Sequence, residues 1–272
     1  MLILNLKGGL GNQLFQLIAA YHFHELHNYK RMYIYYGNLR FYKTPRKFEL
    51  REFISQSPMK IEIIDVKWII LLNKLFLGLL AKFNFLIVNE INFFNKKSLN
   101  GIQIIDGYFQ SSEFITFSSL NYIKQSMSFS KNIFQFKIDK ILLNNTIGLH
   151  FRFTDRFSKM SFDNVRNIIS TFDFSKYDKV LLFSDDSEYC KSLFPFFENP
   201  VILVSQFNLS DKEEFFLIRM LKSFIVPNST FSIMARILSD KSDITFYRKD
   251  DFLENSKNLL DILKDNSNCI PF

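Results

Sequence analysis

The chain has 272 residues, enough to bury either one large core or the cores of two ordinary domains. Its formal net charge of +7 permits an anionic partner, but 34 Phe residues among many Lys, Asn and Ile also fit AT-rich coding bias, so the charge selects no partner by itself. Cys190 and Cys269 are too few and too far apart for a disulfide framework or a zinc site, which favours a reducing compartment.

The first half of the chain alternates strand-like and helix-like runs, which predicts an α/β sheet. We expect a strand at 2–6, a glycine-containing turn at 7–11, a helix at 12–26, a strand at 31–36, an irregular segment at 37–60, a helix at 66–83 and a strand at 101–106. Because the N-terminus leads directly into a strand and lacks the order of a signal peptide, we expect a cytoplasmic protein.

The turn after the first strand is rich in glycine, in the motif LNLKGGLGNQLFQ at 4–16. Small residues at a helix start let a ligand approach the backbone. Leu14 stands where a dinucleotide fingerprint needs its third glycine, and the Gly-Lys-Ser/Thr ending of a P-loop is missing. We therefore expect a ligand-lining loop of another kind, or a tight turn whose polar residues only cap the helix. Its candidate residues are Gly9, Gly11, Asn12 and Gln13.

The stretch 68–88 is long enough to span a membrane, but it carries two Lys and two Asn residues. We expect a buried amphipathic helix followed by a short strand. Peripheral contact with a membrane surface is the second alternative, and a spanning helix is the third.

A polar stretch at 121–145 predicts a boundary between two domains, which we place at 1–135 and 136–272. The second half alternates more regularly and predicts a mostly parallel, doubly wound domain. We expect strands near 146–151, 179–184, 201–205, 223–226 and 243–247, and helices near 161–172, 187–194, 211–222, 230–239 and 252–264.

The strand at 146–151 ends in His150 and leads to Arg152 and Asp155. Strand alternation places His150 and Arg152 on one face, with Phe151 and Phe153 on the other. A guanidinium at a strand end can hold a diphosphate and neutralise charge on a leaving group. Asp155 could position these groups or accept a proton from an incoming hydroxyl. The alternative is an Arg-Asp pair that only fixes a turn.

The strand at 179–184 ends in Ser184 and leads into Asp185 and Asp186, and these three are candidate donor-binding residues. One acid suits a helix N-cap, and the other, Asp185, could accept hydrogen bonds from a nucleobase or a ribose. Two neighbouring carboxylates could also bind a metal ion, but no third ligand lies at a suitable spacing, so we expect no metal.

The strand at 223–226 leads into the turn PNSTFS, where a capped helix start offers N–H groups, hydroxyls and a positive dipole end to a phosphate. The alternative is a plain capped helix. The candidate donor-binding residues of this turn are Asn228, Ser229, Thr230, Phe231 and Ser232. Each polar turn is weak evidence alone. Three in sequence order predict one site for a nucleoside diphosphate.

The motifs GGLGNQLFQ at 8–16, GYFQSSEF at 107–114, HxR at 150–152, FSDD and NSTFS resemble those of the bacterial α-1,2-fucosyltransferases of glycosyltransferase family 11, in the same order. Two departures stand out. Phe153 to Arg156 is closer to the HxRRTD turn of α-1,6-fucosyltransferases, and Ile233 and Met234 replace an aromatic pair.

The resemblance implies a GT-B-like α/β fold of two Rossmann-like, doubly wound domains that face a central cleft. It implies an acceptor-side domain first and a GDP-sugar domain second, with no metal or other cofactor. Arg152 would hold the β-phosphate of the donor and His150 would line the same pocket. Asp185 would contact the nucleoside, and residues 229–232 would cradle the diphosphate.

We therefore expect an inverting transferase that moves L-fucose from GDP-β-L-fucose to an oligosaccharide or glycolipid, at O2 of a terminal galactose. One alternative keeps the fold with another GDP-activated deoxysugar or a heptose as donor. Another is a catalytically silent nucleotide-sugar-binding protein of envelope polysaccharide assembly. A nucleic acid is the last choice of partner, because the positive charges are scattered and no binding module is recognisable.

Overall fold

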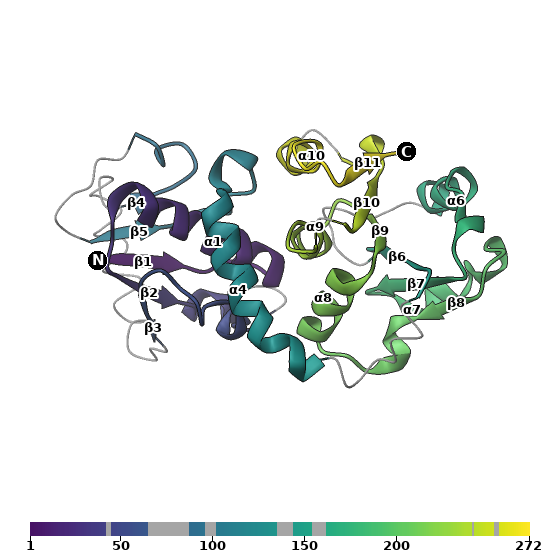
Figure 1. Ribbon diagram of the computed structural model, residues 1–272, viewed down its shortest axis with the longest axis horizontal. Helices are drawn as coiled ribbons and strands as arrows, with labels where there is room; N and C mark the ends of the chain where they lie inside the picture. Colours follow the sequence, from purple (N-terminus) through teal and green to yellow (C-terminus); the bar gives the residue numbers. More distant parts are fainter. Residues whose placement is uncertain are drawn as a thin grey trace. The chain divides into compact units, whose positions relative to one another are not determined.

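The computed structural model describes residues 1–41, 45–64, 87–95, 102–134, 144–153, 162–240, 242–252 and 256–272. The chain divides into two compact units, Met1–Ser130 and Lys131–Phe272, each containing its own parallel sheet (Figure 1). The predicted helix at 66–83 and the predicted boundary between 135 and 136 lie outside the described residues. No helix in the described ranges is both long and apolar enough to cross a bilayer.

The first unit contains a five-stranded parallel sheet in the order β3-β2-β1-β5-β4. Its strands and helices are β1 (Leu2–Asn5), α1 (Leu10–His27), β2 (Arg31–Tyr35), β3 (Lys60–Ile64), β4 (Ile87–Val88), β5 (Gln103–Ile105) and α4 (Phe117–Phe134), whose end lies past Ser130 in the second unit. The apolar run of β1 suits a central strand, and Leu2 and Leu4 are fully buried. β3 begins at Lys60, the last residue of the segment predicted to be irregular, and was not predicted as a strand. Its alternating charged and apolar residues suit its half-exposed place at the sheet edge.

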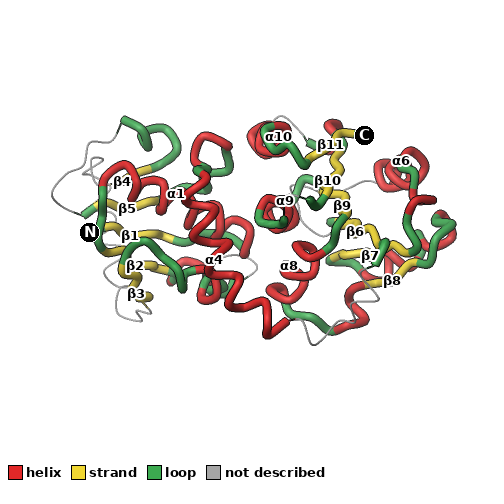
Figure 2. The backbone as a smooth tube through the Cα atoms, viewed as in Figure 1, coloured by secondary structure: helices red, strands yellow, loops and turns green. Residues whose placement is uncertain are grey.

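Helices α1 and α4 pack together in this unit (Figure 2), with Tyr21 and Tyr122 in edge-to-face contact at 5.7 Å between ring centroids. Helix α4 was not predicted, and it runs into the polar stretch at 121–145 as far as Phe134. One side of this helix is buried at Ser119, Ile123, Ser126 and Met127. Two of these four residues are serines, so the helical period is hidden in a hydrophobicity pattern.

The second unit contains a six-stranded sheet in the order β11-β10-β9-β6-β7-β8, with every neighbouring pair parallel. Its strands and helices are β6 (Thr146–Phe151), α6 (Phe162–Thr171), β7 (Lys179–Ser184), α7 (Ser187–Lys191), β8 (Val201–Leu203), α8 (Asp211–Met220), β9 (Ser223–Val226), α9 (Thr230–Ile237), β10 (Ile244–Tyr247), α10 (Lys257–Lys264) and β11 (Cys269–Pro271). The predicted strands and helices of this half lie at or close to their expected positions. β11 was not expected, because it is short and contains a proline, which an edge strand tolerates.

The central strand β6 separates a hydrophobic core from the face that carries polar groups. Phe151 and Phe153 belong to the core cluster beneath the sheet. On the other face, a Cβ atom added to Gly148 would lie 2.3 Å from the ring of Phe224, so the close packing there requires glycine. His150 follows on the same face as Gly148, by strand alternation.

Candidate functional site

The carboxyl ends of β6 and β9 form the centre of the candidate site. β6 pairs with β7 on one side and with β9 on the other, so the strand order reverses between β6 and β9. Ligands of open α/β sheets bind at such a switch point, just beyond the carboxyl ends of the strands. His150 and Arg152 leave β6 at this point, and the turn at 227–229 leaves β9 beside them.

Two side chains from the end of β6 contact hydroxyl groups of the turn after β9. Nη1 of Arg152 lies 3.5 Å from Oγ of Ser229, at the long limit for a hydrogen bond. Nδ1 of His150 lies 3.1 Å from Oγ of Ser232. Two of the three polar turns predicted to share a ligand are therefore in direct contact.

His150 is electrically neutral at pH 7. Burial and the positive charge of Arg152 together lower its pKa to about 4, against the opposing effect of Asp185. The positive charge at the end of β6 is therefore that of Arg152, and His150 contributes a neutral hydrogen-bonding group.

The N-terminus of α9 lacks the usual side-chain cap. Ser229 occupies the predicted N-cap position, but its hydroxyl makes no capping hydrogen bond, and the first turn contains no acidic residue. The side chain of Asn228 instead donates to Oγ of Ser256, at 2.8 Å. The first N–H groups of a helix have no partner within the helix, so this end suits an anion.

The turn after β7 supports the end of β6. Oδ1 of Asp185 accepts a hydrogen bond from the backbone N–H of Phe153 at 2.8 Å, which holds the chain immediately after Arg152. Asp186 caps α7 by accepting from the N–H of Tyr189 at 3.0 Å, and Oγ of Ser184 accepts from the N–H of Asp186. Ser184 and Asp186 therefore hold the turn itself, and their predicted contact with a donor remains a prediction.

Of the other predicted residues, Phe231 contacts His150 edge to face, with 6.4 Å between the ring centroids. Asp155 lies outside the described residues, and Gly9, Gly11, Asn12 and Gln13 belong to the first unit. Gln13 is fully buried, where its amide donates to the carbonyl of Lys47 at 2.7 Å and accepts from the N–H of Glu49 at 3.1 Å. The same amide also donates to the carbonyl of Gly8 at 3.1 Å, so Gln13 stabilises the glycine turn.

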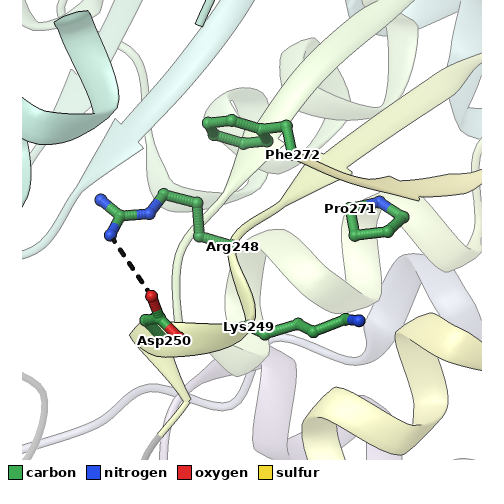
Figure 3. A pocket seen from close by; sticks show the side chains of 5 residues that line it. All are labelled: Arg248, Lys249, Asp250, Pro271 and Phe272. Atoms are coloured by element: carbon green, nitrogen blue, oxygen red, sulfur yellow. Dashed lines mark ion pairs between the residues drawn. The ribbon is translucent and has the colours of Figure 1, made fainter. Parts of the chain in front are cut away.

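Arg248 and Lys249 are basic residues at the same sheet edge that the sequence prediction overlooked. They follow β10 and, with Asp250 and residues 271–272, line an open hollow of about 340 Å³ (Figure 3). Nη2 of Arg248 lies 3.9 Å from Oδ2 of Asp250, and Nη1 donates to the carbonyl of Asn164 at 3.3 Å. The signal was available in the sequence, because charged residues follow a strand directly.

No group of three or more His, Cys, Asp or Glu side chains is placed to hold a metal ion anywhere in the described ranges. The groups described at the ends of β6 and β9 are the Arg152 cation, neutral hydrogen-bonding groups and a helix N-terminus, together with the Asp185 carboxylate that accepts from the N–H of Phe153. This combination suits an anion such as a diphosphate.

No protein-family model matches the chain, and no curated protein matches it in sequence. Solved structures resemble it in fold. The fucosyltransferase NodZ from Bradyrhizobium has a TM-score of 0.55 at 12% identity, over 88% of this chain and 93% of that chain. NodZ alpha-1,6-fucosyltransferase soaked with GDP-fucose has a TM-score of 0.53 at 13% identity, over 88% and 92%. The R284K mutant of Arabidopsis thaliana FUT1, in complex with GDP, has a TM-score of 0.53 at 13% identity, over 87% and 68%.

These similarities concern the fold. With its two parallel α/β sheets, the chain has the GT-B-like fold of these fucosyltransferases.

Proposed function

We propose that the chain is an inverting glycosyltransferase that moves L-fucose from GDP-β-L-fucose to a hydroxyl group of a glycan. The observation that carries the proposal is the contact of Arg152 and His150 with the turn at the start of α9. The similar structures add support, since NodZ is a fucosyltransferase that was soaked with GDP-fucose and FUT1 was in complex with GDP.

The charges at this site suit the proposed reaction. The acceptor oxygen attacks C1 of the sugar, the bond from C1 to the β-phosphate oxygen breaks, and the linkage inverts from β to α. Negative charge grows on the departing diphosphate, where the guanidinium of Arg152 and the N–H groups of α9 would stabilise it. His150, neutral at pH 7, would donate or accept a hydrogen bond without adding charge.

The proton of the acceptor hydroxyl must leave as the new bond forms. Asp155 is our proposed base, and a water molecule is the alternative acceptor. Asp185 would contact the nucleoside while it also holds the backbone after Arg152. We further propose that no metal is required, and that the first unit takes the acceptor while the second takes the donor.

The finer assignment is transfer to O2 of a terminal galactose, as in glycosyltransferase family 11. The motifs at 8–16 and 107–114 support it. The donor could instead be another GDP-activated deoxysugar or a heptose. Ile233 and Met234, which replace the aromatic pair of that family, are fully buried in α9, so the replacement changes packing beneath the site.

The test is turnover of GDP-sugars with galactose-terminated acceptors in excess chelator, followed by mass spectrometry. We expect transfer from GDP-fucose, and we expect Arg152→Ala to lower kcat about a hundredfold, equivalent to about 3 kcal/mol of barrier. Arg166→Ala is the matched control, because Arg166 is exposed on α6. Wild-type turnover in Arg152→Ala would refute the leaving-group role, and GDP binding without transfer would favour a silent binding protein.

A further inference from the structure

The sheet of the first unit has a switch point of its own, between β1 and β5. The chain proceeds from β1 to β2 on one side, and β5 pairs with β1 on the other (Figure 1). Polar side chains meet where these two strands end. Nδ2 of Asn5 donates to Oδ1 of Asp106 at 2.8 Å, and Nζ of Lys7 lies 2.8 Å from the same oxygen.

The segment after β5 is attached to the glycine turn at two places. The first attachment is the contact of Asp106 with Asn5 and Lys7. The side chains of Lys7 and Asp106 are both about 30% exposed. The second is a hydrogen bond of 2.7 Å from Nε2 of Gln110 to Oδ1 of Asn12. Tyr108 lies between these two points along the chain.

The backbone around Tyr108 is held in an unusual conformation. Phe109 has a φ of 53°, which is rare for a residue with a side chain, and its ring is fully buried against Phe93 and Phe114. Oε1 of Glu90 accepts hydrogen bonds from the backbone N–H groups of both Tyr108 and Phe109. While Phe109 is anchored inward, Tyr108 remains 39% exposed. Strained backbone that its surroundings maintain is characteristic of ligand-binding segments.

These residues form a surface that we name the Tyr108 patch, which comprises Lys7, Asn12, Asp106, Tyr108 and Gln110. It combines an aromatic ring with amide, carboxylate and ammonium groups that are already fixed by mutual hydrogen bonds. Because Lys7 neutralises Asp106, and Glu90 adds a negative charge beside them, the patch does not favour an anion.

We propose that the Tyr108 patch binds a neutral sugar residue of the acceptor glycan. A pyranose presents hydroxyl groups at its rim and an apolar C–H face. The rim would exchange hydrogen bonds with Asp106, Gln110 and Asn12, and the apolar face would lie on the ring of Tyr108. Glu90 is a positioning residue that holds the backbone beneath the ring. The inference rests on the proposed function, since it locates the acceptor.

The test uses the whole chain with an array of neutral glycans, followed by ligand-observed NMR on those that bind. We expect Tyr108→Ala and Asp106→Asn each to weaken glycan binding about tenfold, and Tyr108→Phe to retain most of it because the ring remains. Phe117→Ala is the control, because Phe117 is a 79% exposed aromatic residue of the same unit, at the start of α4. The Phe117→Ala variant should bind the glycans with wild-type affinity.

Kinetics provide the second readout. Tyr108→Ala should raise the KM for the glycan about tenfold, while the Kd for GDP stays within about twofold of wild type. A wild-type protein that binds no glycan, or a Tyr108→Ala variant with wild-type glycan affinity, would overturn the proposal. Failure of the wild-type protein to bind GDP would instead overturn the proposed function, so the two failures are distinguishable.

Discussion

The neutral state of His150 predicts a specific loss of stability in acid. Its pKa in the folded chain is about 4, compared with an ordinary value of 6.5, because burial and Arg152 oppose its protonation. Below pH 6.5 the unfolded chain therefore takes up a proton that the folded chain refuses, and folding loses free energy until the pH falls to about 4. At pH 5 these two pKa values correspond to a loss of about 2 kcal/mol from this residue.

The assay compares wild type with His150→Asn by urea denaturation at pH 8 and pH 5. Asn can retain a hydrogen bond to Ser232 but cannot titrate. We expect acidification to destabilise wild type by about 2 kcal/mol more than the variant. Because each protein is compared with itself, groups far from residue 150 cancel in the difference. Equal losses in the two proteins would show that His150 titrates normally and would refute the reasoning.

Two further predictions concern buried groups of the second unit. Arg236 donates to three backbone carbonyls and one hydroxyl, and Arg236→Met should lower the free energy of unfolding by about 3 kcal/mol or more, because these acceptors lose their partner. Urea denaturation of wild type, Arg236→Met and the exposed-site control Lys222→Met measures this loss. An unchanged midpoint for Arg236→Met would contradict the prediction. The Cys190 side chain is fully buried and burial raises the pKa of its thiol to about 11, so this thiol should react with a disulfide reagent at pH 8 only after unfolding. Rapid labelling of Cys190 in the folded protein would count against this.

The strands of the second unit were the most predictable part of the fold. The runs at 179–184 and 223–226 are continuous and apolar, as buried parallel strands are, and the structure has strands with the same bounds. α4 was less predictable because small polar residues occupy two of the four buried positions known between residues 117 and 127. The edge strands β3 and β11 were missed because edge positions demand little of their sequence.

The sequence also predicted which turns carry the polar residues of the second unit, because strand ends can be located from local pattern. It did not predict the partners of those residues. The contact of Asp185 with a nucleoside stays a prediction, and its hydrogen bond from the N–H of Phe153 was not predicted. In the first unit, the bond between Asn5 and Asp106 joins residues 101 positions apart, and no local pattern records such a contact.

The parallel pairing of β6 with β9 has a consequence for synthesis of the chain. β6 ends at Phe151, but its partner β9 begins only at Ser223, and the hydroxyls that meet Arg152 and His150 lie beyond that. A nascent chain that has emerged only through β7 and β8 can pair three strands while the hydroxyl groups that contact Arg152 and His150 are still inside the ribosome. A fragment that stops before Ser223 would accordingly retain Arg152 and lose the hydroxyl groups that it contacts.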